Sequence, residues 1–433
     1  MLIQPILLTH PETAAVVRSK LTLRILPVVT ALFVLCFLDR VNLSFAAFDM
    51  TNDLRLSPSV YGFGAGVFFW GYLLCEIPAA RLVERRSASF WLGSMLIAWG
   101  CAATLMGTIS TVAEFYVYRV VLGIAEAGFF PGILIYLSRW FPQADRARAV
   151  GALAVGLPAA NLLGAPVSGW LLAQTWLQLP GWRWVFIVEG IPSVVAGVLV
   201  ILFLKNRPRQ AQWLTREEQE WLETTLAREQ SARPVGTGGG IRTYLQGPFL
   251  LLVLIWFLDN VGVYGFNLWL PMILRGLSGY SSSAVAFLSA APFVGALIAA
   301  AVVCLSSDRR KERMWHTALP MIIFGSGMGL SVLLHENLWW SLGALSMAAL
   351  GLTSGTPGFW AIVTSAYAGS IHVAVITSAG ALGGMAGPLL VGYLREFRGD
   401  FLAGLAALSF CVILAGCLIL VWCRLGWPTK PPS

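Results

Sequence analysis

Charged residues are scarce in this chain. They make up 12% of its 433 residues, whereas 57% of the residues are hydrophobic, and the mean hydropathy is +0.75. A soluble protein of this length needs far more charge to cover its surface. The shortage therefore excludes an ordinary soluble globular protein and indicates a protein that crosses a membrane many times.

The motifs of enzymes are missing as well. The sequence has no phosphate-binding loop, no nucleophile beside a base and no cluster of metal ligands. Its seven cysteines fall in apolar runs without metal-ligand spacing, so we expect them to pack as small residues. Basic patches with interleaved aromatic residues are also absent. We therefore expect neither an enzyme nor a nucleic-acid-binding protein, and no cofactor.

What the chain does contain is long apolar runs. A membrane-spanning helix needs about 20 apolar residues, and twelve runs meet this length: 25–47, 60–80, 90–109, 113–138, 149–173, 183–204, 249–271, 284–305, 315–334, 338–362, 371–394 and 401–423. The only long polar segment separates the sixth run from the seventh. The pattern predicts an all-α membrane protein with two six-helix bundles, over 1–204 and 249–433, joined by a cytoplasmic linker over 205–248.

The positions of lysine and arginine predict the orientation. These residues concentrate in the linker and in alternate loops, such as 80–89 and 304–313, and are sparse in the loops between them. Cytoplasmic loops are the ones enriched in positive charge. We therefore expect a multi-pass membrane protein with both termini in the cytoplasm.

The linker carries the signal of a short amphipathic helix. Thr215 is followed three residues later by Glu218, the spacing of a capping box. Trp221, Leu222 and Leu226 then fall on one side of the helix. The favoured interpretation is a tether lying on the inner membrane surface, and the alternative is a regulatory docking site.

Several ionisable residues lie inside the predicted spans. Such residues are costly in a membrane and normally face a bundle interior with a function. By helix rise, Asp39, Arg40 and Arg119 share one depth, with Glu126 nearer the midplane. Four charges at similar depth on two helices exceed what packing requires. For Asp259, a packing role and a functional role are equally compatible with its position. Glu76 and Glu189 lie nearer the membrane interfaces, and a packing role explains them more simply.

Such a cluster can couple an anion to a proton. The fork of an arginine suits a carboxylate, and a neighbouring acid changes its proton affinity when that arginine becomes occupied. The mechanism requires a small organic anion and protons as the coupling ion. We therefore expect a proton-coupled anion transporter.

The same residues resemble a known family. "RVVLGIAEAGFFPGILIYLSRWFPQADRARAV" (119–150), "LDRVNLSFA" (38–46) and "GWRWVFIVEGIPSVVAGV" (181–198) are similar to the fourth, first and sixth helices of the anion:cation symporters in the major facilitator superfamily. Within it, the chain is similar to bacterial tartrate, phthalate and hydroxyphenylacetate permeases, which implies a location in the bacterial inner membrane. The resemblance implies two bundles, a central cavity, alternating access and import of a hydroxy-acid, sugar acid or aromatic acid with protons.

The resemblance also implies roles for individual residues. Asp39 and Glu126 take the protonation roles, and Arg40 receives the substrate carboxylate. The remaining candidates for substrate binding are Arg119, Tyr72, Asn42, Asp259, Asn260, Tyr264, Trp360 and Thr377. Two arginine-rich turns supply candidate residues for a latch between conformations, namely Arg85, Arg86, Asp308, Arg309 and Arg313.

The chain departs from the family pattern in both halves. "ITSAGALGG" (376–384) has Thr377 and Ala381 where the family carries asparagines, and His372 follows a turn that is shorter than usual. Ser87 and Glu84 replace the usual glycine and aspartate of the first latch. His372 is interpreted as a helix-end residue, with a titrating gate as the alternative. The substrate therefore cannot be copied from the family.

Two other functions stay open. A proton-coupled exporter or exchanger favours acids without cavity arginines, so Arg40 and Arg119 argue against it. A sensor that binds a ligand without moving it is compatible with the same residues, although such proteins often carry large soluble domains. We expect a monomer in the lipid bilayer whose partners are the organic anion and protons.

Overall fold

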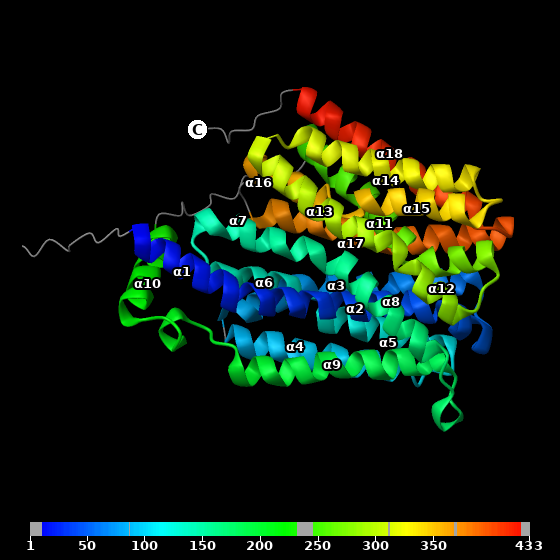
Figure 1. Cartoon of the computed structure of the whole chain (residues 1–433), viewed down its shortest axis with the longest axis horizontal. Coiled ribbons are helices and arrows are strands. Elements are labelled where there is room, and N and C mark those ends of the chain that lie inside the picture. Colours follow the sequence, from blue (N-terminus) through cyan, green and yellow to red (C-terminus); the bar gives the residue numbers. More distant parts are fainter. Residues whose placement is uncertain (1–10, 86, 232–245, 311, 368–369, 426–433) are drawn as a thin grey trace, which may run out of the picture.

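The computed structural model describes residues 11–85, 87–231, 246–310, 312–367 and 370–425. Two bundles of long helices lie side by side (Figure 1). The first contains α2 (Leu26–Asp53), α3 (Pro58–Arg85), α4 (Ala88–Met106), α5 (Val112–Glu126), α6 (Phe129–Ser138), α8 (Gly156–Leu172) and α9 (Gly181–Phe203). The second contains α11 (Gly247–Ser278), α12 (Ser282–Ser289), α13 (Ala291–Arg310), α14 (Met314–Leu333), α15 (Leu338–Leu352), α16 (Thr356–Ala366), α17 (Ser370–Arg398) and α18 (Leu402–Arg424).

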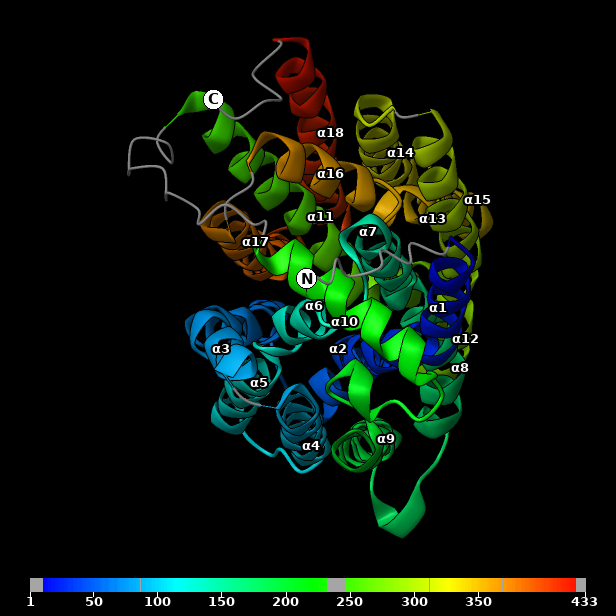
Figure 2. The ribbon, with the colours of Figure 1, turned by 90° about the vertical axis from the view of Figure 1, so that its left-hand side faces the viewer.

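The predicted spans are confirmed as helices. Among the described residues, ten helices are long and apolar enough to cross a membrane. The other two predicted spans correspond to α3 and to the consecutive helices α15 and α16, which run beside the rest (Figure 2). The molecule is thus an all-α membrane protein with six spans on each side of the linker.

Four predicted spans are broken where a single helix was expected. The breaks separate α5 from α6, a 3-10 turn η1 (Ala152–Val155) from α8, α12 from α13, and α15 from α16. In each case a proline stands in the first turn of the helix that restarts: Pro131, Pro158, Pro292 and Pro357. Proline lacks an N–H but fits this first turn, where no intrahelical acceptor is needed. These four prolines therefore mark the points where the helices restart.

The two bundles meet closely at the end of the molecule away from the linker, here called the far end. Tyr61 donates a hydrogen bond to the carbonyl of Leu268 at 3.0 Å. Glu396 accepts bonds at 3.0 Å from the Ser57 hydroxyl and the Ser59 N–H. On the other side of the interface, Ser282 donates to Asp49 at 2.6 Å. These bonds hold residues of the first bundle against residues of the second.

Glycine lets α3 and α17 approach backbone to backbone. A Cβ on Gly62 would lie 2.5 Å from the carbonyl oxygen of Pro388, and one on Gly66 would lie 2.7 Å from that of Met385. Real side chains do not tolerate such approaches, so only glycine fits at these crossings.

At the opposite end, here called the linker end, the linker packs on the first bundle. It forms η3 (Pro208–Gln210) and α10 (Arg216–Ser231), beside α1 (Pro11–Arg24) and α7 (Gln143–Gly151) (Figure 1). The predicted capping box is confirmed, because Thr215 Oγ1 accepts from the Glu218 N–H at 3.3 Å and Glu218 accepts from the Thr215 N–H at 2.8 Å.

The apolar side of α10 faces protein. Leu222 and Leu226 are buried in the core of the first bundle, and Trp213 stacks on Trp140 with 5.9 Å between ring centroids. Lys20 of α1 also pairs with Glu218 at 2.8 Å. The apolar side of this helix therefore contacts protein, and the favoured interpretation of a tether on the inner membrane surface stays a prediction.

Candidate functional site

A buried ion pair occupies the centre of the molecule. Arg40 Nε donates to Glu126 Oε2 at 2.6 Å. The Glu126 side chain is fully buried, and the Arg40 side chain keeps 14% of its surface exposed. Glu126 is the last residue of α5, directly before the break that leads into α6. The break thus places a carboxylate at a helix end, in reach of α2.

Aromatic rings surround the Arg40 guanidinium. Its carbon lies 5.4 Å from the Phe37 ring, 5.1 Å from the Phe68 ring and 5.3 Å from the Tyr72 ring. Rings at such distances stabilise a cation through their quadrupoles. Tyr72, predicted from sequence to bind substrate, is therefore brought to Arg40.

Arg40 also reaches the second bundle. Its Nη1 donates to the hydroxyl of Tyr264 on α11 at 3.2 Å, and the Tyr264 ring contacts Phe69 with centroids 4.6 Å apart. A guanidinium has five N–H groups, and only two of them have partners among the described residues. Arg40 is thus a cation at the junction of the bundles with donors left for a ligand.

Asp39 points into a different environment from Arg40. It accepts hydrogen bonds from Trp99 Nε1 at 2.9 Å and from Ser193 Oγ at 2.5 Å. Consecutive residues on a helix project about 100° apart, which explains the separation. Within the described part of the chain, one oxygen of Asp39 and one of Glu126 are buried without a partner. Asp39 and Arg40, adjacent in sequence, are not an ion pair.

Arg119 does not join the pair. Its Nε donates to the carbonyl of Gly64 at 3.2 Å and its Nη2 to that of Ala65 at 3.0 Å. Its guanidinium carbon also lies 4.9 Å from the Phe68 ring. Only 2% of the residue is exposed. The structure thus places Arg119 as a link between α5 and α3, and its role in substrate binding stays a prediction.

The remaining candidates from the sequence are spread over both bundles. Asn260 donates to the carbonyl of Trp256 at 2.8 Å, and Thr377 donates to that of Ala374 at 2.9 Å. Trp360 of α16 contacts Trp256 with ring centroids 5.2 Å apart. The structure gathers Asn260, Tyr264 and Trp360 around one face of α11.

Two further candidates are buried elsewhere. Asn42 is 1% exposed and Asp259 is 5% exposed, and neither forms an ion pair within the described residues. No hydrogen bond joins either residue to Arg40 among the described residues, so their role in substrate binding stays a prediction. His372 is 8% exposed, with ring centroids 5.1 Å from both Phe249 and Tyr367.

The predicted latch is described only in part. Arg313 donates to the Ser307 hydroxyl at 2.9 Å, and Arg309 is exposed beside it. Arg86 and the side chains of Arg85 and Asp308 lie outside what the structure describes. The latch therefore stays a prediction.

Sequence reasoning missed the partners of the charges. Trp99 and Ser193, which hold Asp39, come from α4 and α9, and no sequence spacing links them to α2. The grouping of the rings could have been predicted, because Phe68 and Tyr72 are four residues apart and so share a helix face. Trp256, Asn260 and Tyr264 repeat the same spacing on α11.

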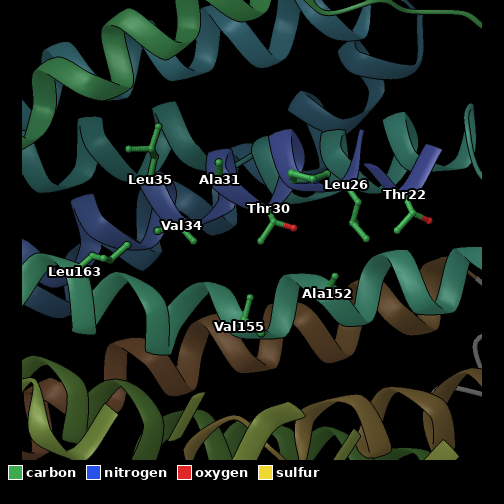
Figure 3. A pocket seen from close by; sticks show the side chains of 10 residues that line it. Thr22, Leu26, Thr30, Ala31, Val34, Leu35, Ala152, Val155 and Leu163 are labelled. Carbon is green, nitrogen blue, oxygen red and sulfur yellow. The ribbon is translucent and has the colours of Figure 1, made fainter. Parts of the chain in front are cut away.

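A separate hollow lies on the outside of the first bundle. It has a volume of about 720 Å³ and is lined by Thr22, Leu26, Pro27, Thr30, Ala31, Val34, Leu35, Ala152, Val155 and Leu163 (Figure 3). None of these residues is charged, and none belongs to the site around Arg40. We therefore place the functional site at the ion pair, where the charged groups lie, and not in this apolar hollow. The described residues also contain no group of side chains that could hold a metal ion.

Two helical bundles that enclose a buried ion pair at their junction define a multi-pass membrane protein. The model of the Major Facilitator Superfamily matches residues 29–388, so the chain belongs to this superfamily and is a transporter, not an enzyme.

Similar proteins agree with this assignment. A putative tartrate transporter of Agrobacterium vitis is 35% identical over 96% of this chain and 93% of its own length. A quinolone resistance transporter of Acinetobacter baumannii is 32% identical over 92% of each chain. A solved structure of a bacterial homolog to the human lysosomal transporter Spinster covers 96% of this chain and 99% of its own, with a TM-score of 0.72 at 17% identity. The last likeness concerns the fold alone.

Proposed function

We propose that the protein imports an organic carboxylate together with protons by alternating access. The observation that carries this proposal is the Arg40–Glu126 pair at 2.6 Å, placed at the junction of the bundles with N–H donors of Arg40 left over. The putative tartrate transporter, 35% identical, supports a carboxylate as the class of substrate.

Charge balance links the anion to the proton. With Glu126 ionised, its charge is compensated by Arg40, and the pair is neutral. A carboxylate that binds Arg40 adds a negative charge to a buried site, where uncompensated charge is costly. A proton on Glu126 restores neutrality, so substrate and proton enter the site together.

Asp39 offers a second site for a proton. It is 1% exposed and is held by two neutral donors, Trp99 and Ser193. An ionised carboxylate without a cation beside it is disfavoured in such surroundings. Asp39 is therefore the residue we assign to proton transfer besides Glu126.

In alternating access, the two bundles would separate first at one end of the molecule and then at the other. The hydrogen bonds from Ser57, Ser59 and Tyr61 hold the far end closed, and they cross from one bundle to the other. In the proposed orientation the linker end and both termini face the cytoplasm of a bacterial inner membrane. The bonds at the far end would then break when the site opens outward, and we propose that one monomer carries the whole cycle.

The test uses purified protein in liposomes that contain a pH dye. A panel of hydroxy-acids, sugar acids and aromatic acids is added outside at constant external pH. Acidification of the lumen that requires one of these acids supports proton symport. Binding of an acid without proton movement would contradict it.

A second function has one observation in its favour. The quinolone resistance transporter is 32% identical over most of both chains, which fits export in exchange for protons. In the same liposomes, prepared with an acidic lumen and candidate drugs outside, drug–proton exchange would appear as alkalinisation of the lumen that depends on the drug. The Arg40–Glu126 pair favours the import of an anion, and the liposome assay distinguishes the two directions.

A further inference from the structure

The second bundle contains a group of packed aromatic rings on α11 and α16, and α11 is also the helix that carries Tyr264. Trp256 and Phe359 stack with centroids 4.6 Å apart and planes inclined by 12°. Trp360 packs edge-on against both, at 5.2 Å from Trp256 and 5.6 Å from Phe359. We call Trp256, Phe359 and Trp360 the aromatic wall. It joins α11 to α16, the short helix that restarts at Pro357.

The aromatic wall and Arg40 are connected along one face of α11. Trp256, Asn260 and Tyr264 follow each other at four-residue spacing, so their side chains line one face at steps of about 6 Å. Tyr264, the last residue of this row, contacts Arg40. About 12 Å of helix therefore separates the residue at the cation from the indole of the wall. Asn260 lies between them.

The two tryptophans of the wall are not fully covered by protein. Trp256 and Trp360 keep part of their surface exposed, whereas Phe359 is buried behind them. Gly380 of α17 leaves no spare room on the other side, because a Cβ there would meet the Trp256 indole and would lie 3.2 Å from the Asn260 side-chain nitrogen. Trp256 and Asn260 are thus covered by protein on the side of α17.

Arg40 itself is lined by rings. Phe37, Phe68 and Tyr72 of the first bundle flank its guanidinium, and Tyr264 completes the set from the second. A polyhydroxylated acid needs hydrogen-bond partners for each hydroxyl group, and a site that lacks them rejects such a ligand. Rings offer few such partners but stack well on other rings.

We propose that the site selects a carboxylate that carries an aromatic ring, with the carboxylate on Arg40 and the ring beside Asn260 against Trp256 and Trp360. The inference rests on the proposed function and narrows its substrate class. It departs from the acid in the name of the similar tartrate transporter, because it assigns selectivity to the aromatic wall.

The test measures binding to the full chain in nanodiscs by isothermal titration calorimetry. The probes are phenylacetate and benzoate as aromatic acids, tartrate and lactate as hydroxy-acids, and benzamide as a ring without a carboxylate. We expect the aromatic acids to bind at least about tenfold more tightly than the hydroxy-acids. Benzamide should bind much more weakly than benzoate, because it cannot pair with Arg40.

Two tryptophan variants assign the preference to the wall. Trp360→Leu should weaken the binding of phenylacetate about tenfold and leave lactate within about twofold. Trp339→Leu is the matched control, since Trp339 is 65% exposed at the start of α15 and far from the wall in sequence and contacts. It should change neither affinity. The melting temperature of both variants shows whether they are folded.

The outcomes separate this inference from the proposed function. Equal affinity for tartrate and phenylacetate, or a preference that survives in Trp360→Leu, would overturn the aromatic selectivity while leaving carboxylate import intact. Failure of every carboxylate to bind the wild-type protein would overturn both. Binding of aromatic acids that is lost in Trp360→Leu but retained in Trp339→Leu supports the inference.

Discussion

One ion pair in the middle of the molecule and two ion pairs at the linker end have similar lengths but very different surroundings. In the middle of the molecule, Arg40 and Glu126 are 2.6 Å apart with exposed side-chain fractions of 14% and 0%. At the linker end, Lys20 and Glu218 are 2.8 Å apart with fractions of 35% and 10%, and Arg18 and Asp145 are 2.8 Å apart with 50% and 19%. Distance alone does not distinguish the two groups.

Burial decides what each group can do. A pair near water gains about 0–1 kcal/mol and is weakened by salt. A buried pair is costly to assemble, and removal of one partner leaves an uncompensated charge. The central pair is therefore sensitive to an arriving ligand or proton, whereas the pairs at the linker end position α1 and α10 on the first bundle.

The largest effect is expected from Arg40→Ala. The change should abolish carboxylate binding, with a loss of more than about 100-fold in affinity, because the charge-assisted hydrogen bonds disappear. It should also destabilise the protein by about 3–5 kcal/mol, since Glu126 is left buried and unpaired. Calorimetry and the melting temperature measure the two effects.

A double variant separates stability from function at this site. Arg40→Leu with Glu126→Leu should recover most of the melting temperature, because no buried charge remains. Binding should stay absent. Carboxylate binding at wild-type affinity in either variant would show that the anion site lies elsewhere.

The next effect concerns coupling. Glu126→Gln should stop accumulation of substrate driven by a pH gradient, while exchange of labelled for unlabelled substrate continues, because Arg40 remains. Uptake and exchange are measured in the same liposomes. Glu189→Gln is the matched control, since Glu189 is equally buried but bonds to Ser168 at 2.5 Å, away from Arg40. Continued uphill accumulation by Glu126→Gln would refute the assignment of the proton.

Arg119→Gln is expected to have a smaller and different effect. Its hydrogen bonds to the carbonyls of Gly64 and Ala65 hold α5 against α3, so their loss should cost about 1–3 kcal/mol of stability. Affinity for the carboxylate should stay within about threefold. A loss of binding as large as that in Arg40→Ala, in folded protein, would instead make Arg119 a substrate ligand.

The smallest effect is expected at the linker end. Burial alone would raise the pKa of Glu218, but the hydrogen bonds from Lys20 and from the Thr215 N–H outweigh it and hold the pKa below its usual value. A lowered pKa in the folded state contributes stability above the unfolded pKa of about 4.3. That contribution is lost as the pH falls through the folded-state value.

Glu218→Gln should therefore lower stability by about 0.2–1 kcal/mol at neutral pH and low salt. The difference from wild type should shrink at high salt and vanish at acidic pH. Melting temperatures across both series check this. A difference that persists under both conditions would mean that the amide disturbs the capping box and not the ion pair.

The sequence predicted the fold well and the site unevenly. Apolar runs fix the helices because a bilayer permits little else, and the capping box at Thr215 is a local pattern that needs no tertiary information. Arg40 and Glu126 were singled out because charge is costly in a membrane, and their roles in transport stay predictions.

The pairing of the charges could not be predicted in the same way. Depth placed Asp39, Arg40 and Arg119 at one level, but direction around each helix decides contact. Arg119 turns toward backbone carbonyls of α3, and Asp39 turns toward Trp99 and Ser193. The break after Glu126 also makes it the last residue of α5, and a uniform helix over 113–138 conceals that break.

The neutrality of the central pair has an energetic consequence for the cell. If one proton neutralises Glu126 for each monocarboxylate held by Arg40, no net charge crosses the membrane in a loaded cycle. The electrical potential would then contribute nothing, and accumulation would follow the pH difference, at about tenfold per pH unit. A dicarboxylate would need a second proton, on Asp39, to cross with the same electrical silence. Under the proposed mechanism, the Arg40–Glu126 pair would tie uptake of the carboxylate to acidity and make it independent of voltage.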